Sequence, residues 1–251
     1  MILVAVGIGL VAGVLSGLFG VGGGIVMTPG IDILLGAAPI VAIATPLPVI
    51  LPTALTGALT YRKAGELDHR AAGWMILAGI PGAVAGAALT EVVDTQLLLM
   101  ATAALLGYQA VGVLRGAERR AAADRLAGPA PYLAVGLVAG LVSGLLGTGG
   151  GLVMVPLLTA WLGMPLKRAL GTSLAAIVVL VIPGTVVHAA LGHIDWGIFL
   201  AVTLGSVPGA RIGAGIALGT RERTLRRLVG TFLLAVATVY GVDVLRSLLR
   251  G

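Results

Sequence analysis

Long apolar runs separated by short charged loops dominate the sequence. The runs show no two-residue alternation of the kind that membrane β-strands require, and many approach the roughly 20 residues of a helix that crosses a bilayer. The pattern therefore predicts an all-α polytopic membrane protein. The predicted helical segments are Ile2–Phe19, Ile25–Leu35, Ile40–Tyr61, Ala71–Leu89, Gln96–Leu114, Tyr132–Leu146, Leu152–Leu162, Ala169–Leu191, Trp196–Leu218 and Leu228–Leu245.

One stretch of the chain occurs twice. Residues 11–30 and 138–157 share 13 identities in 20 positions at an offset of 127 residues, and each contains the pattern Gly-x-Gly-Gly-Gly. The same offset aligns further pairs, namely Thr45 with Thr172, Gly65 with Gly192, Asp68 with Asp195 and Pro81 with Pro208. The duplication thus covers most of the chain and predicts two homologous halves.

Each half contains about four helical segments if the glycine-interrupted helix is counted once. We place the first transmembrane repeat at residues 1–115, a cytoplasmic linker at 116–131 and the second transmembrane repeat at 132–251. The linker is rich in arginine and ends in glycine and proline, which favour a boundary between helices.

The distribution of basic residues favours an inverted repeat. If each glycine-interrupted segment enters and leaves on the same side, as a re-entrant hairpin, each half makes three full crossings and thirteen Lys and Arg residues face the cytoplasm against two outside. Four full crossings per half give nine inside and six outside. Basic loops prefer the cytoplasm, so we expect re-entrant segments and an inverted pseudo-twofold repeat, a common plan in secondary transporters.

The glycine patterns are the main candidate site. A helix interrupted within the membrane leaves free N–H groups at the start of its second part, and these groups together with the helix dipole attract an anion. The alternative is that the glycines only allow close packing or bending. The candidate substrate-binding glycines are Gly22, Gly23, Gly24, Gly149, Gly150 and Gly151.

Several side chains near these glycines could complete an anion site. Hydroxyl candidates are Thr45, Thr148, Thr172 and Ser173, with hydrogen bonding to their own helix as the alternative. Arg211 is the basic residue well inside a predicted segment, so it would supply positive charge or, alternatively, extend to the membrane interface.

Proton coupling has two candidates. Asp32 follows the first glycine pattern and could carry a proton or pair with Arg211, and His188 lies near the end of a predicted segment. The alternative for His188 is a solvated interface residue. Ser16 and Ser143 are duplicated, but each is flanked by glycines, so we interpret them as packing positions.

Composition narrows the function. With 58% hydrophobic and 10% charged residues the chain is far from the roughly 25% charged residues of a soluble domain. It has no cysteine and three histidines, none spaced with carboxylates on one helix face, so we predict no metal site, no cofactor and no catalytic residues. The net charge of +6 comes from short loops, so nucleic acid is not an expected partner.

The repeated motifs give the chain a resemblance to a known family. The stretches SGLFGVGGGIVMTP at 16–29, SGLLGTGGGLVMVP at 143–156 and LGTSL at 170–174 resemble the TauE/SafE sulfite exporter family, also called TSUP. The resemblance implies a multi-pass transporter of the cytoplasmic (inner) membrane that exports sulfite or a related organosulfonate such as sulfoacetate, driven by a proton gradient. The first half departs from the pattern at residues 44–46, where Pro46 replaces a serine.

We therefore predict a secondary transporter that works by alternating access, with a small inorganic or organic sulfur oxyanion as substrate and membrane lipid around it. A passive anion channel and an intramembrane enzyme are the alternatives. The enzyme would need a nucleophile–base pair or a metal cluster, which the sequence does not provide. The sequence leaves a homo-oligomer open.

Overall fold

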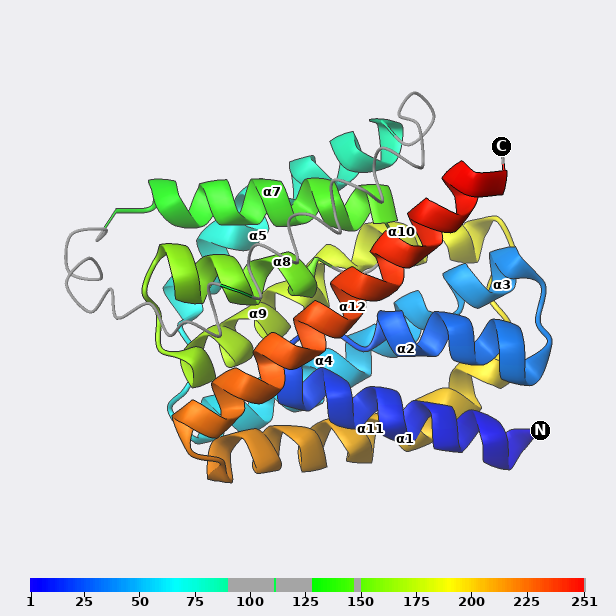
Figure 1. The fold of residues 1–251 in the computed structure, drawn as a ribbon, viewed down its shortest axis with the longest axis horizontal. Helices are drawn as coiled ribbons and strands as arrows, with labels where there is room; N and C mark the ends of the chain where they lie inside the picture. The colour runs from blue at the N-terminus through cyan, green and yellow to red at the C-terminus, as the bar shows by residue number, and fades with distance from the viewer. Residues whose placement is uncertain (90–110, 112–127, 147–149, 251) are drawn as a thin grey trace.

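The computed structural model describes residues 1–89, 111, 128–146 and 150–250, and within these ranges it contains helices and no strands (Figure 1). This confirms the all-α prediction. The elements of the first half are α1 (Ile2–Phe19), α2 (Gly24–Pro29), the π-helix η1 (Gly30–Leu34), α3 (Pro39–Ala44), α4 (Pro46–Lys63) and α5 (His69–Leu89). Those of the second half are α7 (Ala130–Leu146), α8 (Gly151–Pro156), the π-helix η2 (Leu157–Trp161), α9 (Leu166–Leu180), α10 (Ile182–Ala190), α11 (Trp196–Gly219) and α12 (Glu222–Arg250).

The helices follow the predicted segments closely, and proline explains the main differences. The predicted segment 40–61 divides into α3 and α4 at Thr45, next to Pro46, and the predicted segment 169–191 divides into α9 and α10 at Val181, before Pro183. Proline lacks the N–H that would continue the helical ladder. The predicted segment 96–114 and most of the linker 116–131 lie outside the described residues.

Four stretches of helix in the described part of the chain are long and apolar enough to cross a membrane. They are Ile2–Phe19, Pro39–Lys63, Leu166–Ala190 and Trp196–Gly219. The helices that follow the glycine patterns, Gly24–Leu34 and Gly151–Trp161, are shorter. The chain is thus a multi-pass membrane protein, and its two repeated short helices have fewer residues than a membrane crossing needs.

Each short helix doubles back along the long helix before it. A Cβ placed on Gly23 would lie 3.1 Å from the Ala12 carbonyl oxygen, and one on Gly30 would lie 2.8 Å from Ile8, so α2 and η1 run antiparallel to α1. The second half repeats this arrangement, with Gly150 against the carbonyl of Ala139. The glycine patterns are therefore tight reversals between two antiparallel helices.

Each half packs one of its long helices against a helix of the other half. Helix α1 of the first half packs along α11 of the second, and α7 of the second packs along α5 of the first. Small residues make these contacts: Gly13 lies on the backbone of Ser206, and its repeat mate Gly140 lies on Gly79. Close backbone approach through glycine is how membrane helices associate without a hydrophobic driving force.

Repeat-related helices run in opposite directions. In Figure 1, α1 leads leftward from the marked N-terminus, whereas its mate α7 runs rightward. Under the 127-residue offset α4 corresponds to residues 173–190 of α9 and α10, and α4 packs antiparallel to α9, with Gly57 against Leu174 and Tyr61 against Gly171. The two halves therefore face each other along α4 and α9, beside the first glycine reversal.

Candidate functional site

Glycine is required at the reversals by backbone conformation. Gly20 ends α1 with φ of 70°, and Gly22 and Gly23 follow with φ of 82° and 86°. Gly150 precedes α8 with φ of 73°. Residues with a Cβ rarely adopt this left-handed region, so these glycines allow the chain to turn and start a new helix after four intervening residues.

The two reversals meet at the centre of the molecule. A Cβ on Gly151 would lie 2.7 Å from the Gly20 carbonyl oxygen and 2.8 Å from the Val21 Cα. Gly22 faces the repeat-related pair Ile50 and Ile177, both fully buried, each 3.3 Å from where its Cβ would be. The structure thus brings together candidate binding glycines from both halves, and the side chains of Ile50 and Ile177 cover Gly22. Thr148 and Gly149 lie outside the described residues.

Ser173 is the candidate hydroxyl that reaches a reversal. Its Oγ donates to the Gly20 carbonyl at 3.0 Å, and the side chain is fully buried. The contact joins the second half to the reversal of the first. Its repeat mate is Pro46, which has no donor, so this bond has no symmetric partner.

The two candidate threonines lie elsewhere and form a symmetric pair of contacts. Thr172 Oγ1 accepts the backbone N–H of Asp68 at 3.0 Å, and Thr45 Oγ1 accepts that of Asp195 at 3.2 Å. The carboxylate of Asp195 in turn caps α11 through the Ile198 N–H. Each threonine therefore holds the start of a helix from the other half, and neither lies at a glycine reversal.

The two candidate charges are not gathered at the centre. Arg211 is exposed on the face of α11 that also carries the exposed apolar residues Leu204 and Ile212, and Asp32 is exposed on η1. The described residues contain no ion pair between Arg211 and Asp32. The position of Arg211 fits the alternative that its side chain extends along the helix toward the interface.

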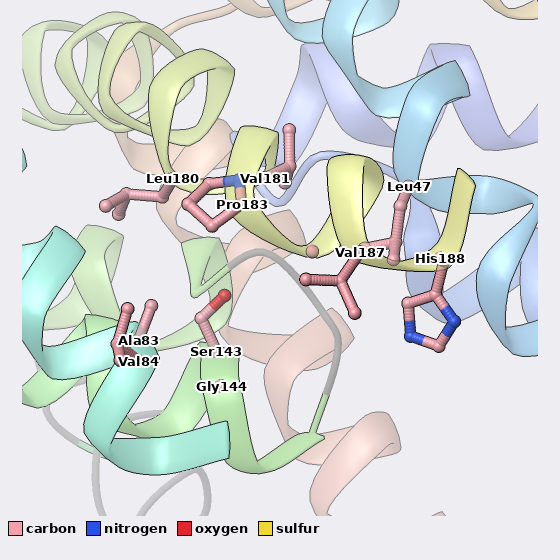
Figure 2. Close-up of a pocket in the computed structure, with 11 residues that line it drawn as sticks. Leu47, Ala83, Val84, Ser143, Gly144, Leu180, Val181, Pro183, Val187 and His188 are labelled. Atoms are coloured by element: carbon pink, nitrogen blue, oxygen red, sulfur yellow. The ribbon is translucent and has the colours of Figure 1, made fainter. Parts of the chain in front are cut away.

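His188 lies at one end of a cavity of about 280 Å³ (Figure 2). Its Nδ1 is 3.1 Å from the Nδ1 of His193 in the following loop. Carbon atoms from α5, α9 and α10 form most of the cavity wall, and Ser143 and Gly144 of α7 border it beside the second reversal. Within the described residues no group of three His, Asp or Glu side chains could hold a metal ion.

Three further polar side chains lie near the reversals or the cavity, and none of them was among the predicted binding residues. Tyr61 is fully buried and its hydroxyl donates to the Gly17 carbonyl at 2.9 Å. Ser16 Oγ is buried without a hydrogen-bond partner among the described residues, and its repeat mate Ser143 borders the cavity. The repeated Gly-x-x-Ser-Gly motif was the available signal for the serines, whereas nothing in the sequence near Tyr61 indicates its contact.

Crossed repeats, two converging helix reversals and several membrane-length helices define a polytopic membrane transporter fold. The model of the family "Sulfite exporter TauE/SafE" matches residues 5–240. The chain therefore belongs to the TauE/SafE family, as its motifs suggested, and it is a membrane transporter, not an enzyme.

Several relatives match over nearly the whole chain. The chain is 30% identical over 247 residues to a "Probable membrane transporter protein" of Xylella fastidiosa, covering 94% of this chain and 93% of that one. It is 28% identical over 259 residues to "Probable membrane transporter protein YunE" of Bacillus subtilis, covering 91% and 93% of the two chains. No solved structure matches the chain significantly.

Proposed function

We propose that the protein exports sulfite or a related sulfur-containing oxyanion across the cytoplasmic membrane by proton-coupled alternating access. The family carries the name sulfite exporter, and the chain's electrostatics suit an anion, because the reversals offer backbone N–H groups at the start of two helices. The bound anion would contact Gly22–Gly24 and Gly150–Gly151, with the Ser173 hydroxyl beside them.

One observation carries the proposal: the two repeated reversals converge on each other. The backbone of Gly151 lies against Gly20 and Val21, so the start of α8 lies directly against the reversal that precedes α2. In secondary transporters with inverted repeats, substrates bind at such an interface near the bilayer midplane. Buried Ile50 and Ile177 close over Gly22 here, so these two side chains would have to move aside before an anion could reach it.

The placement of basic residues supports the inverted topology. Lys167 Nζ at the start of α9 donates to the Leu218 carbonyl at the end of α11, at 2.6 Å. The end of α4, with Arg62 and Lys63, lies at the same end, because Tyr61 packs on Gly171 of α9. Basic groups from both halves thus gather at one end of the molecule, which we assign to the cytoplasm.

Transport is tested with purified protein in liposomes loaded with sulfite. We expect sulfite efflux that saturates with concentration and accelerates when an inward proton gradient is imposed, with protein-free liposomes as the background. Efflux that is linear in concentration and indifferent to the proton gradient would instead support a passive channel. The absence of sulfite efflux under either condition would refute the proposed substrate.

A pair of glycine variants tests the site itself. Gly22→Ala introduces a Cβ at φ of 82° and 3.3 Å from Ile50 and Ile177, whereas Gly65→Ala introduces the same backbone strain, at φ of 76°, where nothing lies within 4 Å. We expect Gly22→Ala to abolish efflux and Gly65→Ala to retain it. Equal efflux by the two variants would show that the reversal is not the site.

A further inference from the structure

The turn that ends α10 brings two histidine side chains together. His188 lies in the last turn of α10, and His193 lies in the loop that leads to α11 (Figure 2). Their Nδ1 atoms are 3.1 Å apart, and their ring centroids are 5.3 Å apart at an interplanar angle of 51°. Both side chains are partly exposed, so solutes can reach them.

The backbone of the turn fixes this pair. Gly192 has φ of 70°, the His193 N–H donates to the His188 carbonyl at 3.0 Å, and the Gly192 N–H donates to the Ala189 carbonyl at 3.2 Å. These two bonds define a Schellman cap, in which the residue after the left-handed glycine lies beside a residue of the last helical turn, commonly with a hydrophobic contact between them. Here the two places hold imidazoles instead.

The first half has the same cap with different side chains. Gly65 has φ of 76°, and the Glu66 N–H donates to the Tyr61 carbonyl at 2.9 Å. The side chain of Tyr61 is buried, and its hydroxyl donates to Gly17 instead of meeting Glu66. The repeated turn therefore does not require a pair of nitrogen ligands, and the histidine pair is a feature of the second half alone.

The distance between the two nitrogens suits a metal ion. With Zn–N bonds of about 2.0–2.1 Å, two nitrogens 3.1 Å apart subtend an angle of about 95–102° at the metal. This angle lies between the right angle of square-planar and octahedral sites and the tetrahedral angle. When each ring carries its proton on Nε2, both Nδ1 lone pairs are free for one ion. Imidazole nitrogen is a preferred ligand of Zn²⁺, Cu²⁺ and Ni²⁺.

The surroundings favour a cation. The carbonyl end of a helix carries partial negative charge, and the exposed carboxylate of Asp195 follows two residues after His193. Gly184 of α10 faces Leu47 at the start of α4, whereas Lys63 lies at the opposite end of α4. The histidine pair is therefore at the end of the molecule away from its basic end, which the proposed topology places outside the cytoplasm.

We propose that His188 and His193 form a binding site for one borderline divalent cation, namely Zn²⁺, Cu²⁺ or Ni²⁺, through their Nδ1 atoms. Water fills the other coordination positions, so the site has two protein ligands and differs from a closed structural site. The sequence predicted no metal site because the histidines share no helix face with carboxylates. The pair arises from the cap, which crosses from the helix into the loop.

Binding is tested by titration calorimetry on the full-length protein in detergent. The protein carries no polyhistidine tag and is first treated with a chelator, and ZnCl₂ and NiCl₂ are the probes. We expect one ion per chain, with the affinity reduced at least tenfold in His188→Ala and in His193→Ala. The matched control is His69→Ala, because His69 is the remaining histidine of the chain and is exposed at the start of α5; this variant should bind as the wild type does.

Two outcomes would overturn the site. The absence of binding by the wild-type protein would show that the two imidazoles only share a hydrogen bond. Equal affinities of the wild type, His188→Ala and His193→Ala would show that the metal binds elsewhere. If His188→Ala does not fold, His193→Ala in the loop answers the same question.

Two further readouts do not depend on the heat of binding. Zn²⁺ at 100 times its dissociation constant should raise the melting temperature by about 5–11 °C in the wild type and in His69→Ala, with no such rise in His193→Ala. The electron paramagnetic resonance spectrum of bound Cu²⁺ should show coupling to two imidazole nitrogens. Coupling to one nitrogen, or to none, would contradict the pair.

These measurements are independent of the proposed transport. They use no sulfite, so a protein that failed to move sulfite would still bind the metal if the site exists. Conversely, sulfite efflux by a protein that binds no metal would leave the transport proposal standing and remove the site.

Discussion

Replacing Gly13 by alanine should weaken the contact between the halves. Gly13 lies in α1 at its crossing with α11, where an added Cβ would lie 2.7 Å from the Ser206 Cα and would also overlap the Ser206 carbonyl oxygen. Carbon atoms pack at about 3.5–4.0 Å, so the two helices would have to separate by about 0.8 Å or more. Both obstacles are backbone atoms, which cannot rotate aside.

The magnitude follows from a matched control in the same helix. Gly7→Ala introduces the same methyl group where nothing lies within 4 Å, so both variants gain the same helix propensity, about 1 kcal/mol. The difference between them is the packing cost, about 2–3 kcal/mol for an overpacked interface. A gap of this size also forfeits a quarter to a half of the dispersion energy across the crossing.

The assay is thermal unfolding in detergent, followed by tryptophan fluorescence and by the fraction of monodisperse protein after heating. For a chain of this size each kcal/mol corresponds to about 2–4 °C, so Gly13→Ala should unfold roughly 4–12 °C below Gly7→Ala. Coincident melting temperatures would refute the reasoning, because they would mean that α1 and α11 do not approach as closely as the structure has them.

Three side-chain replacements extend these tests. Thr172→Val should lower the melting temperature by about 2–4 °C relative to Thr185→Val, because Thr172 also accepts the Asp68 N–H from the other half whereas Thr185 bonds only its own helix; equal melting would argue against this contact. Ser173→Ala should lower the initial rate of sulfite efflux by tenfold or more, since it removes the donor to a reversal carbonyl, and an unchanged rate would exclude a role in transport. Arg211→Ala should stay within twofold of the wild-type rate because Arg211 faces outward, so a large loss would return this charge to the anion path.

Much of the fold could be predicted because its signals are local. Segment lengths followed from apolar runs, and the reversals followed from Gly-x-Gly-Gly-Gly, since only glycine readily adopts the positive φ found at Gly20, Gly22 and Gly23. The duplication could be read directly from the chain. The places where proline divides a segment, such as Thr45 before Pro46, were only partly visible, because proline in a membrane helix either kinks it or ends it.

The pairing of helices could not be predicted in the same way. Which long helix packs on α1 is decided by contacts 190 residues or more apart, such as Gly13 on Ser206, and small-residue stripes occur on several helices. Whether a candidate residue reaches the site also depends on which face of its helix it occupies, and the sequence does not determine that face. Arg211 is one residue away from buried Ala210, yet it is exposed, and Thr172 is adjacent to Ser173 but binds Asp68 instead of a reversal.

The two repeats differ at a few positions that form hydrogen bonds in one half only, and no single motif reveals these differences. Two hydrogen bonds, from Tyr61 to Gly17 and between Thr53 and Ser206, have no repeat-related counterpart among the described residues, where His188 and Leu180 replace Tyr61 and Thr53. At about 1 kcal/mol each, two such bonds would favour the conformation seen here by roughly thirtyfold over one in which both are broken. Substitutions that restore symmetry should therefore move the population toward equality without destroying either state, and a duplicated transporter can set its resting orientation through a few unmatched positions.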